Sequence, residues 1–168
     1  MKVGYLGPVG TFSHAALLAS PRVPDGAEEI PCSSEGEAIL AVQDGSLDAA
    51  LVPVENAIEG GVNATVDALI HDAPDLVVDG EELLAVSHAL IGHAGLSLDS
   101  VTEVISHPQP LGQCRGTLAR MLPGRPLRPV SSTAEAIRIV SESQAPLVAV
   151  GHPAAAELYG VSVLEEAI

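Results

Sequence analysis

The chain has 168 residues, 47% of them hydrophobic and only 17% charged, so it can build a folded core and intrinsic disorder is disfavoured. Its formal net charge is -15 and Lys2 is its only lysine, which excludes the basic face that nucleic-acid binding needs. Cys32 and Cys114 form no CxxC pair, and neither a signal peptide nor an apolar run of transmembrane length is present. We therefore expect a cytoplasmic protein with neither a nucleic acid nor a membrane as a partner.

The chain opens with a predicted strand over residues 2–6, followed by a turn rich in glycine and proline. Thr11 or Ser13 is placed to cap the next helix. Such a turn can present backbone N–H groups to an anion. It lacks both the GxGxxG spacing and the lysine of GxxxxGK[ST], so we reject a nucleotide site. A short strand over residues 30–32 follows, and then a helix whose capping box is formed by Ser34 and Glu37.

The most informative stretch runs from residue 49 to residue 65. Residues 49–54 are a continuous apolar run, typical of a strand buried on both faces. Glu55 and Asn56 arrive where this strand should leave the core, Gly60-Gly61 let the chain turn, and an apolar pattern at helical spacing follows. Ligands of α/β proteins bind at such strand ends. An ordinary strand-to-helix connection with a solvated Glu55 fits the same pattern.

The second half of the chain repeats the alternation of strands and helices. Residues 71–80 form a connection, and residues 83–91 an extended apolar segment that we interpret as the crossing into a second lobe. A strand at residues 104–105 ends in the polar sequence SHPQP. The remaining predicted elements are a helix over 111–122, a strand over 127–130, a helix over 133–141, a strand over 147–151 and a helix over 154–159.

An internal similarity supports two lobes. Residues 33–42 align with residues 131–140, and six of the ten positions are identical. Two unrelated amphipathic helices with the same cap would produce some of this similarity by chance. The alternative, which we prefer, is an α/β fold of two similar lobes with a cleft between them. The first lobe would comprise residues 1–75, with residues 161–168 returning to it, and the second residues 76–160.

Polar residues gather at three predicted strand ends: at Glu55-Asn56, at Ser106-His107 with Gln113, and at residues 131–133. None of these groups has the spacing of metal ligands, and no GxSxG elbow is present. Each residue also has a structural interpretation. Ser132 and Thr133 suit a helix cap, and His107 suits a turn before proline.

Together these segments resemble one family. The stretches GYLGPVGTFS (4–13), PVENAIEGGVNATVD (53–67), SHPQPLGQC (106–114) and STAEA (132–136) are similar to the successive motifs of prephenate dehydratase and occur in the family's order. The resemblance extends to residue 160 and implies two α/β lobes of the periplasmic-binding-protein type II. It also implies conversion of prephenate to phenylpyruvate, water and carbon dioxide in phenylalanine biosynthesis, by a homodimer without cofactor or metal.

The resemblance also implies which residues form the site. Catalytic roles fall to Glu55, Asn56, Ser106 and Gln113. Substrate-binding roles fall to Thr11, Asn56, Gly61, His107, Gln113, Ser132 and Thr133. Within this set, Glu55 either anchors its loop or lies near the leaving hydroxyl, and His107 is expected to shape its turn rather than to transfer a proton.

Two features depart from the family pattern. Ala57 occupies a position where the family usually has a hydroxyl residue, and the Thr-Arg-Phe motif and the ACT domain would lie beyond Ile168. We therefore expect the chain ending at Ile168 to be a poor dehydratase. Two alternatives stay open: an enzyme that decarboxylates prephenate without aromatising it, and a non-catalytic module that binds a small molecule.

Overall fold

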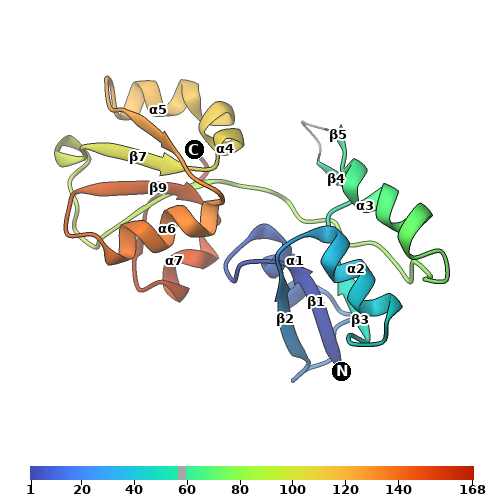
Figure 1. Cartoon of the computed structure of the whole chain (residues 1–168). Helices are drawn as coiled ribbons and strands as arrows, with labels where there is room; N and C mark the ends of the chain where they lie inside the picture. Colours follow the sequence, from blue (N-terminus) through green and yellow to red (C-terminus); the bar gives the residue numbers. More distant parts are fainter. Residues whose placement is uncertain (57–59) are drawn as a thin grey trace. The chain divides into compact units, whose positions relative to one another are not determined.

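The computed structural model describes residues 1–56 and 60–168, which form two compact units, Met1–Leu84 (unit 1) and Ala85–Ile168 (unit 2) (Figure 1). The boundary lies later than the predicted one at residues 75/76. Residues 73–88 contain no helix or strand, but Glu82 accepts a hydrogen bond of 2.7 Å from the Ser20 hydroxyl. This bond fixes the connection to unit 1 beyond residue 75.

Unit 1 is a small parallel sheet with helices on both faces. Its elements are β1 (Lys2–Leu6), α1 (Phe12–Ala19), β2 (Glu28–Cys32), α2 (Glu35–Gln43), β3 (Ala49–Leu51), β4 (Glu55–Asn56), β5 (Gly60–Gly61), α3 (Asn63–Asp67) and the π-helical turn η1 (Ala68–Asp72). The strand order is β2-β1-β3, all parallel. Because side chains alternate along a strand, Val3 and Tyr5 pack with Leu17 of α1, whereas Cys32 packs with Ala38 of α2.

The stretch around residues 49–65 differs in part from its prediction. β3 ends at Leu51, and its residues are half-buried rather than buried on both faces, because β3 is the edge strand of the sheet. Glu55-Asn56 pairs with Gly60-Gly61 as the antiparallel hairpin β4–β5. The Val62 N–H closes the hairpin by donating to Val54 O at 2.8 Å. The expected helix follows as α3 and η1, and Ala57 lies outside the described residues.

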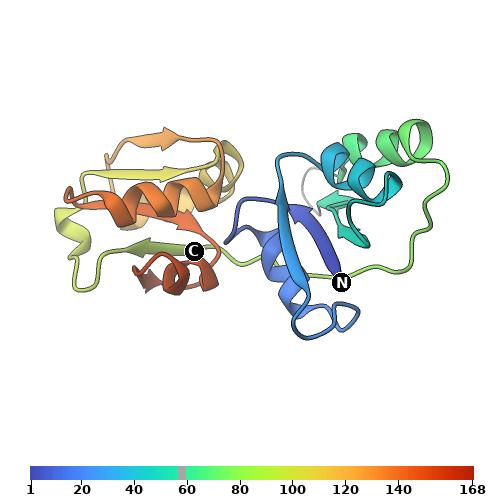
Figure 2. The same ribbon diagram turned by 60° about the horizontal axis from the view of Figure 1, so that its bottom comes forward.

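Unit 2 has a larger, mixed sheet. Its elements are β6 (Ala89–Gly92), the 3₁₀ turn η2 (Leu98–Ser100), β7 (Glu103–Ser106), α4 (Pro108–Gln113), α5 (Arg115–Met121), β8 (Leu127–Pro129), α6 (Thr133–Glu142), β9 (Leu147–Gly151), α7 (Ala154–Leu158) and β10 (Ser162–Glu165). The strand order is β10-β6-β9-β7-β8. The strands β7, β8 and β9 are parallel, and β6 runs against β9, as its green arrow in Figure 2 shows. The single helix predicted over 111–122 is two helices, α4 and α5, which meet at Cys114.

Helices cover both faces of the unit 2 sheet, with α6 and α7 on one side and α5 on the other (Figure 1). Ile105 and Ala149 face Ile137 of α6, and Val148 faces Leu118 of α5. A Cβ added to Gly151 would lie 2.8 Å from Ile137 Cδ1. The glycine therefore lets α6 pack closely on the end of β9.

The last residues belong to unit 2, so the prediction that residues 161–168 return to the first lobe is wrong for this structure. β10 pairs antiparallel with β6, with Ser162 opposite Gly92. The Ile168 N–H then donates to His88 O at 3.0 Å. Val163 and Leu164 pack against the clusters on opposite faces of the unit 2 sheet. An apolar strand pattern identifies such a strand but not the sheet that it joins.

The internal similarity has a structural counterpart. The order β2-β1-β3 in unit 1 matches β8-β7-β9 in unit 2, all parallel in both units. The similar segments are α2 and α6, which occupy equivalent places between the second and third strands. Ser34 accepts from Glu37 N at 3.1 Å, and Ser132 accepts from Glu135 N at 3.0 Å. The predicted α/β class with two similarly built units is confirmed.

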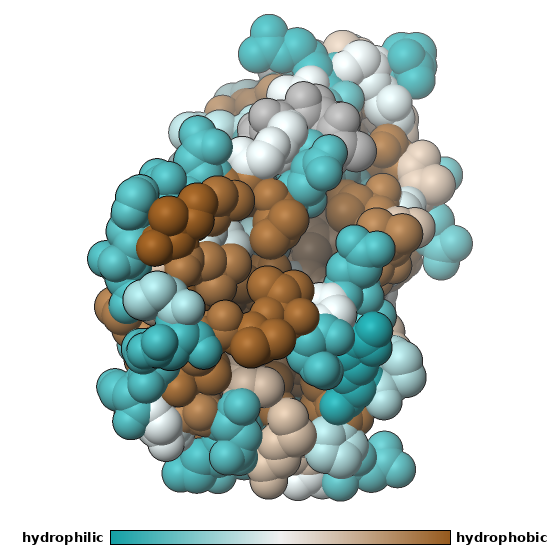
Figure 3. All heavy atoms as spheres, turned by 90° about the vertical axis from the view of Figure 1, so that its right-hand side faces the viewer, coloured by the Kyte–Doolittle hydropathy of each residue, from teal (hydrophilic) through white to brown (hydrophobic). Residues whose placement is uncertain are grey.

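The surface of unit 1 carries exposed apolar side chains. Figure 3 looks onto the side of Figure 1 that carries α3 and shows apolar residues in brown there. The exposed large apolar residues of α3, η1 and the rest of unit 1 after them are Val66, Ile70, Val77, Val78 and Leu83. In the described parts of the chain, no helix has both the length and the apolar character needed to cross a membrane.

Candidate functional site

Polar side chains gather at one edge of the unit 2 sheet, by which we mean the end where its parallel strands finish and not an outermost strand. The parallel strands β7, β8 and β9 end at this edge, and antiparallel β6 begins there, because Ala89 lies opposite Gly151. We call the side chains at this edge the edge cluster; its members are His88, Ser106, Gln113, Thr133 and His152. The carboxyl ends of parallel strands are the usual ligand-binding position in α/β sheets.

Ser106 holds the edge together. Its side chain is fully buried, and its hydroxyl donates to Val150 O at 2.6 Å. Its carbonyl accepts from Val130 N at 2.9 Å. These bonds join the ends of β7, β8 and β9, so the hydroxyl has a structural partner. The predicted catalytic role of Ser106 stays a prediction.

Gln113 and His88 form a pair. Gln113, an exposed residue at the end of α4, accepts at Oε1 from His88 Nε2, with 2.9 Å between the atoms. His88 is only 8% exposed and directly precedes β6. Sequence reasoning identified Gln113 but missed His88. The sequence feature that could have pointed to His88 is its place as the one histidine within an extended apolar segment, residues 83–91.

His107 caps α4. Its Nδ1 accepts from Gln109 N at 3.4 Å, and its carbonyl accepts from Leu111 N at 3.3 Å. This contact agrees with the predicted role in shaping the turn. A contact between His107 and a substrate stays a prediction.

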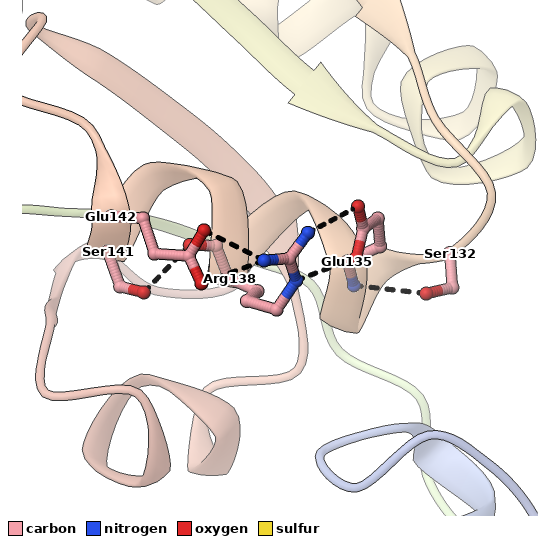
Figure 4. A network of polar contacts seen from close by, with 5 residues as sticks. All are labelled: Ser132, Glu135, Arg138, Ser141 and Glu142. Carbon is pink, nitrogen blue, oxygen red and sulfur yellow. Dashed lines mark hydrogen bonds and ion pairs between the residues drawn. The ribbon is translucent and has the colours of Figure 1, made fainter.

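Ser132 and Thr133 begin α6. The Ser132 hydroxyl caps the helix by accepting from Glu135 N (Figure 4). Thr133 is 8% exposed, and its Cβ lies 3.4 Å from the position of a Cβ built on Gly151, which places it beside the end of β9. The structure therefore brings Thr133 to the same edge as Ser106 and His152.

Arg138 of α6 is already paired with carboxylates. Its guanidinium binds Glu135 through two bonds of 2.9 and 3.0 Å and Glu142 through two of 2.7 and 2.8 Å (Figure 4). The hydrogen bond from Arg138 lowers the pKa of Glu135. With its charge neutralised on both sides, Arg138 is poorly suited to bind an anionic ligand.

His152 adds a second imidazole to the edge cluster. Its Nδ1 accepts from Ala154 N at 3.1 Å, at the start of α7. Burial, and secondarily the neighbouring His88, lower the pKa of His152. His152 is therefore neutral at pH 7, and this edge can offer hydrogen bonds without a fixed positive charge at this position.

In unit 1, Thr11 organises the glycine-rich turn after β1. Its hydroxyl donates to Leu6 O at 3.0 Å and accepts from His14 N at 3.2 Å. His14 Nδ1 accepts from Gly10 N at 3.2 Å, and its ring stacks on Tyr5 with centroids 4.9 Å apart. The sequence predicted Thr11 or Ser13 as the cap, of which the structure shows Thr11, but it did not predict this role of His14.

The predicted residues Glu55, Asn56 and Gly61 belong to the β4–β5 hairpin, in which Glu55 lies opposite Gly61. Glu55 is exposed and Asn56 half-buried. Thr65 is fully buried and donates its hydroxyl to Pro53 O at 2.6 Å, which fixes the start of α3 to the chain before the hairpin. Within residues 1–56 and 60–168, no group of three His, Cys, Asp or Glu side chains is placed to hold a metal ion.

The fold and these residues define an α/β protein in two units, with hydrogen-bonding side chains at the carboxyl edge of a sheet. The family model of prephenate dehydratase matches residues 3–168, so the chain belongs to the prephenate dehydratase family. It is 39% identical over 144 residues to prephenate dehydratase of Bacillus subtilis, covering 84% of this chain and 50% of the relative.

Two solved structures are similar over the whole chain. Prephenate dehydratase of Arthrobacter aurescens in complex with L-Phe is 36% identical, with a TM-score of 0.89 and 55% of that chain covered. GqqA, described as a novel type of quorum quenching acylase, is 30% identical, with a TM-score of 0.85 and 59% of that chain covered. The chain thus spans about half the length of the curated relatives it matches.

Proposed function

We propose that this protein acts as a prephenate dehydratase in phenylalanine biosynthesis. The observation that carries the proposal is the edge cluster of unit 2, found in a chain that the family model matches over residues 3–168. In the reaction, prephenate loses its ring carboxylate as carbon dioxide, and its 4-hydroxyl takes up a proton and leaves as water. Aromatisation to phenylpyruvate drives this step.

The protein has to bind carboxylates and assist the departure of the hydroxyl. We assign binding to Gln113 and Thr133 of the edge cluster. For Asn56, Thr11 and Gly61 of unit 1, we propose a binding role from the family resemblance of their motifs alone. Amide and hydroxyl donors suit this task, since the chain carries only seven Lys and Arg side chains against 22 Asp and Glu. We propose that the carboxyl group of Glu55 lies near the hydroxyl that leaves prephenate as water.

The test measures affinity for prephenate and formation of phenylpyruvate separately. Asn56→Ala and Gln113→Leu should each weaken binding by roughly 10- to 150-fold, the value of a hydrogen bond to a charged group of about 1.5–3 kcal/mol. Lys2→Gln, which removes an exposed cation at the start of β1, should leave both prephenate affinity and phenylpyruvate formation unchanged. Failure of the unmodified chain to bind prephenate would refute the proposal.

Product analysis separates the alternatives. A non-aromatic dihydro product would indicate decarboxylation alone, and binding without turnover would indicate a binding module. An acylase is a further candidate because of the similarity to GqqA. It is less well supported, since the hydroxyl of the buried Ser106 is bonded to Val150 O. Release of an acyl group from an acylated quorum-sensing signal would favour it.

We further propose a cytoplasmic homodimer. The support is the exposed apolar surface at Val66, Ile70, Val77 and Val78, since large exposed apolar patches commonly mark interfaces. Light scattering on Ile70→Asp should then show a smaller mass than on Leu158→Asp, a matched change at an exposed leucine of unit 2. Equal masses would place the interface elsewhere.

A further inference from the structure

We propose that His88 is a positioning residue that fixes the side-chain amide of Gln113 with its NH₂ group directed at an anionic ligand. The inference rests on the proposed function for the identity of that ligand, a carboxylate. Its structural part concerns the unliganded protein and can be judged independently.

We assign to His88 the tautomer that donates from Nε2. Gln113 Oε1 is an acceptor only, so the Nε2 atom 2.9 Å from it must carry the proton. The carbonyl oxygen of Gln113 is thereby turned toward the buried ring. The amide nitrogen, on the other side of the same planar group, points away from His88 with two N–H donors.

Burial makes this orientation stable. His88 is 8% exposed, and its backbone carbonyl accepts from Ile168 N at 3.0 Å, so the residue is held where β6 begins. Gln113 is exposed and ends α4, and its amide would otherwise rotate freely. A freely rotating amide presents its oxygen to a ligand as readily as its nitrogen, and the oxygen repels a carboxylate. With its proton on Nε2, His88 can only donate to this amide, so the bond favours the orientation that turns the oxygen inward and the nitrogen outward.

Three substitutions separate positioning from packing. His88→Leu removes the donor, whereas His88→Gln places an amide N–H near the position of Nε2 and should restore binding. His93→Leu is the matched control, because His93 follows the opposite end of β6 and bonds Ser143 O at 2.8 Å. Melting temperatures of all variants show which changes merely destabilise the unit.

Prephenate affinity should fall roughly 2- to 13-fold in His88→Leu, the equivalent of a hydrogen bond of about 0.5–1.5 kcal/mol. It should return toward the unmodified value in His88→Gln and stay unchanged in His93→Leu. In a Gln113→Leu background, His88→Leu should have no further effect on binding. Equal losses in His88→Leu and His93→Leu, or additive losses with Gln113→Leu, would overturn the proposal.

Nitrogen-15 NMR of the unliganded chain provides the second readout. We expect the Nε2–H tautomer for His88, with a coupling across the bond to Gln113; an Nδ1–H tautomer would overturn the inference directly. If the unmodified chain shows the Nε2–H tautomer but does not bind prephenate, the proposed function fails and the orientation of the amide stands.

Discussion

At the scale of single residues, the polar side chains of unit 2 divide by what their atoms already bind. Ser106, Ser132 and His107 direct their side chains to backbone groups. Gln113 binds the side chain of His88, which leaves its amide nitrogen directed outward. Residues of the first kind mainly hold the sheet edge in shape, and Gln113, the residue of the second kind, is the one that we propose to contact a ligand.

Ser106 gives the first prediction. Ser106→Ala leaves the buried Val150 O without the 2.6 Å bond, so the free energy of unfolding should fall by about 1–3 kcal/mol. Chemical denaturation measures this loss. Ser100→Ala is the control, because that hydroxyl also bonds a carbonyl at 2.6 Å but is exposed. Unchanged stability with greatly reduced turnover would instead favour a catalytic role for Ser106.

His152 gives the second prediction. Its pKa in the folded state is lowered from the ordinary value of 6.5, so the unfolded chain binds more protons in the interval below 6.5. Its contribution to stability is complete above that value and is lost as the pH falls through the lower, folded-state pKa. His152→Asn keeps an acceptor for Ala154 N but cannot titrate. Its melting temperature should therefore fall less than that of the unmodified chain between about pH 7.5 and 5.5; parallel curves would contradict this.

At the scale of elements, local patterns such as strand runs and helix caps predicted the elements that the structure confirms. Strands β1 and β9 match their predicted bounds to the residue, and the sequence alone indicates Ser34 and Ser132 as capping residues. Local patterns do not report pairing between distant segments. For this reason the partner of β10 and the contact between His88 and Gln113, 25 residues apart, were missed. The break at Cys114 was also missed, since the apolar spacing continues from α4 into α5.

The α6 cap gives the third prediction. Ser132→Ala should lower the free energy of unfolding by about 1 kcal/mol, whereas Ser132→Asn, a good capping residue, should nearly preserve it. Ser34→Ala tests the equivalent cap of α2 in unit 1. If Ser132→Asn retains stability but loses affinity for prephenate, the serine hydroxyl also contacts the substrate.

At the scale of the whole molecule, each hydrophobic cluster found among the described residues lies within one unit. The two clusters of unit 2 include fully buried residues such as Ile105 and Val148. The three clusters of unit 1 are smaller, and only two of them include residues of its three-stranded sheet. The units therefore differ in the apolar area that stabilises them.

The fourth prediction follows from this difference. Amides of β1 and β3 should exchange hydrogen through an opening of lower free energy than amides of β7 and β9. Native-state hydrogen exchange in increasing denaturant, followed by mass spectrometry, resolves the two units. Convergence of all core amides on one free energy and one denaturant dependence would show a single cooperative unit instead.

In the repeated architecture, β3 of unit 1 corresponds to β9 of unit 2. Strand β9 has a neighbour on each side, whereas β3 pairs with β1 alone in the sheets formed by the described residues. The outer backbone groups of Ala49–Leu51 are therefore suited to β-augmentation, in which an added extended segment continues the ladder. Because this margin is only three residues long, it offers few hydrogen bonds, which restrains the edge-to-edge aggregation that longer unpaired strands promote.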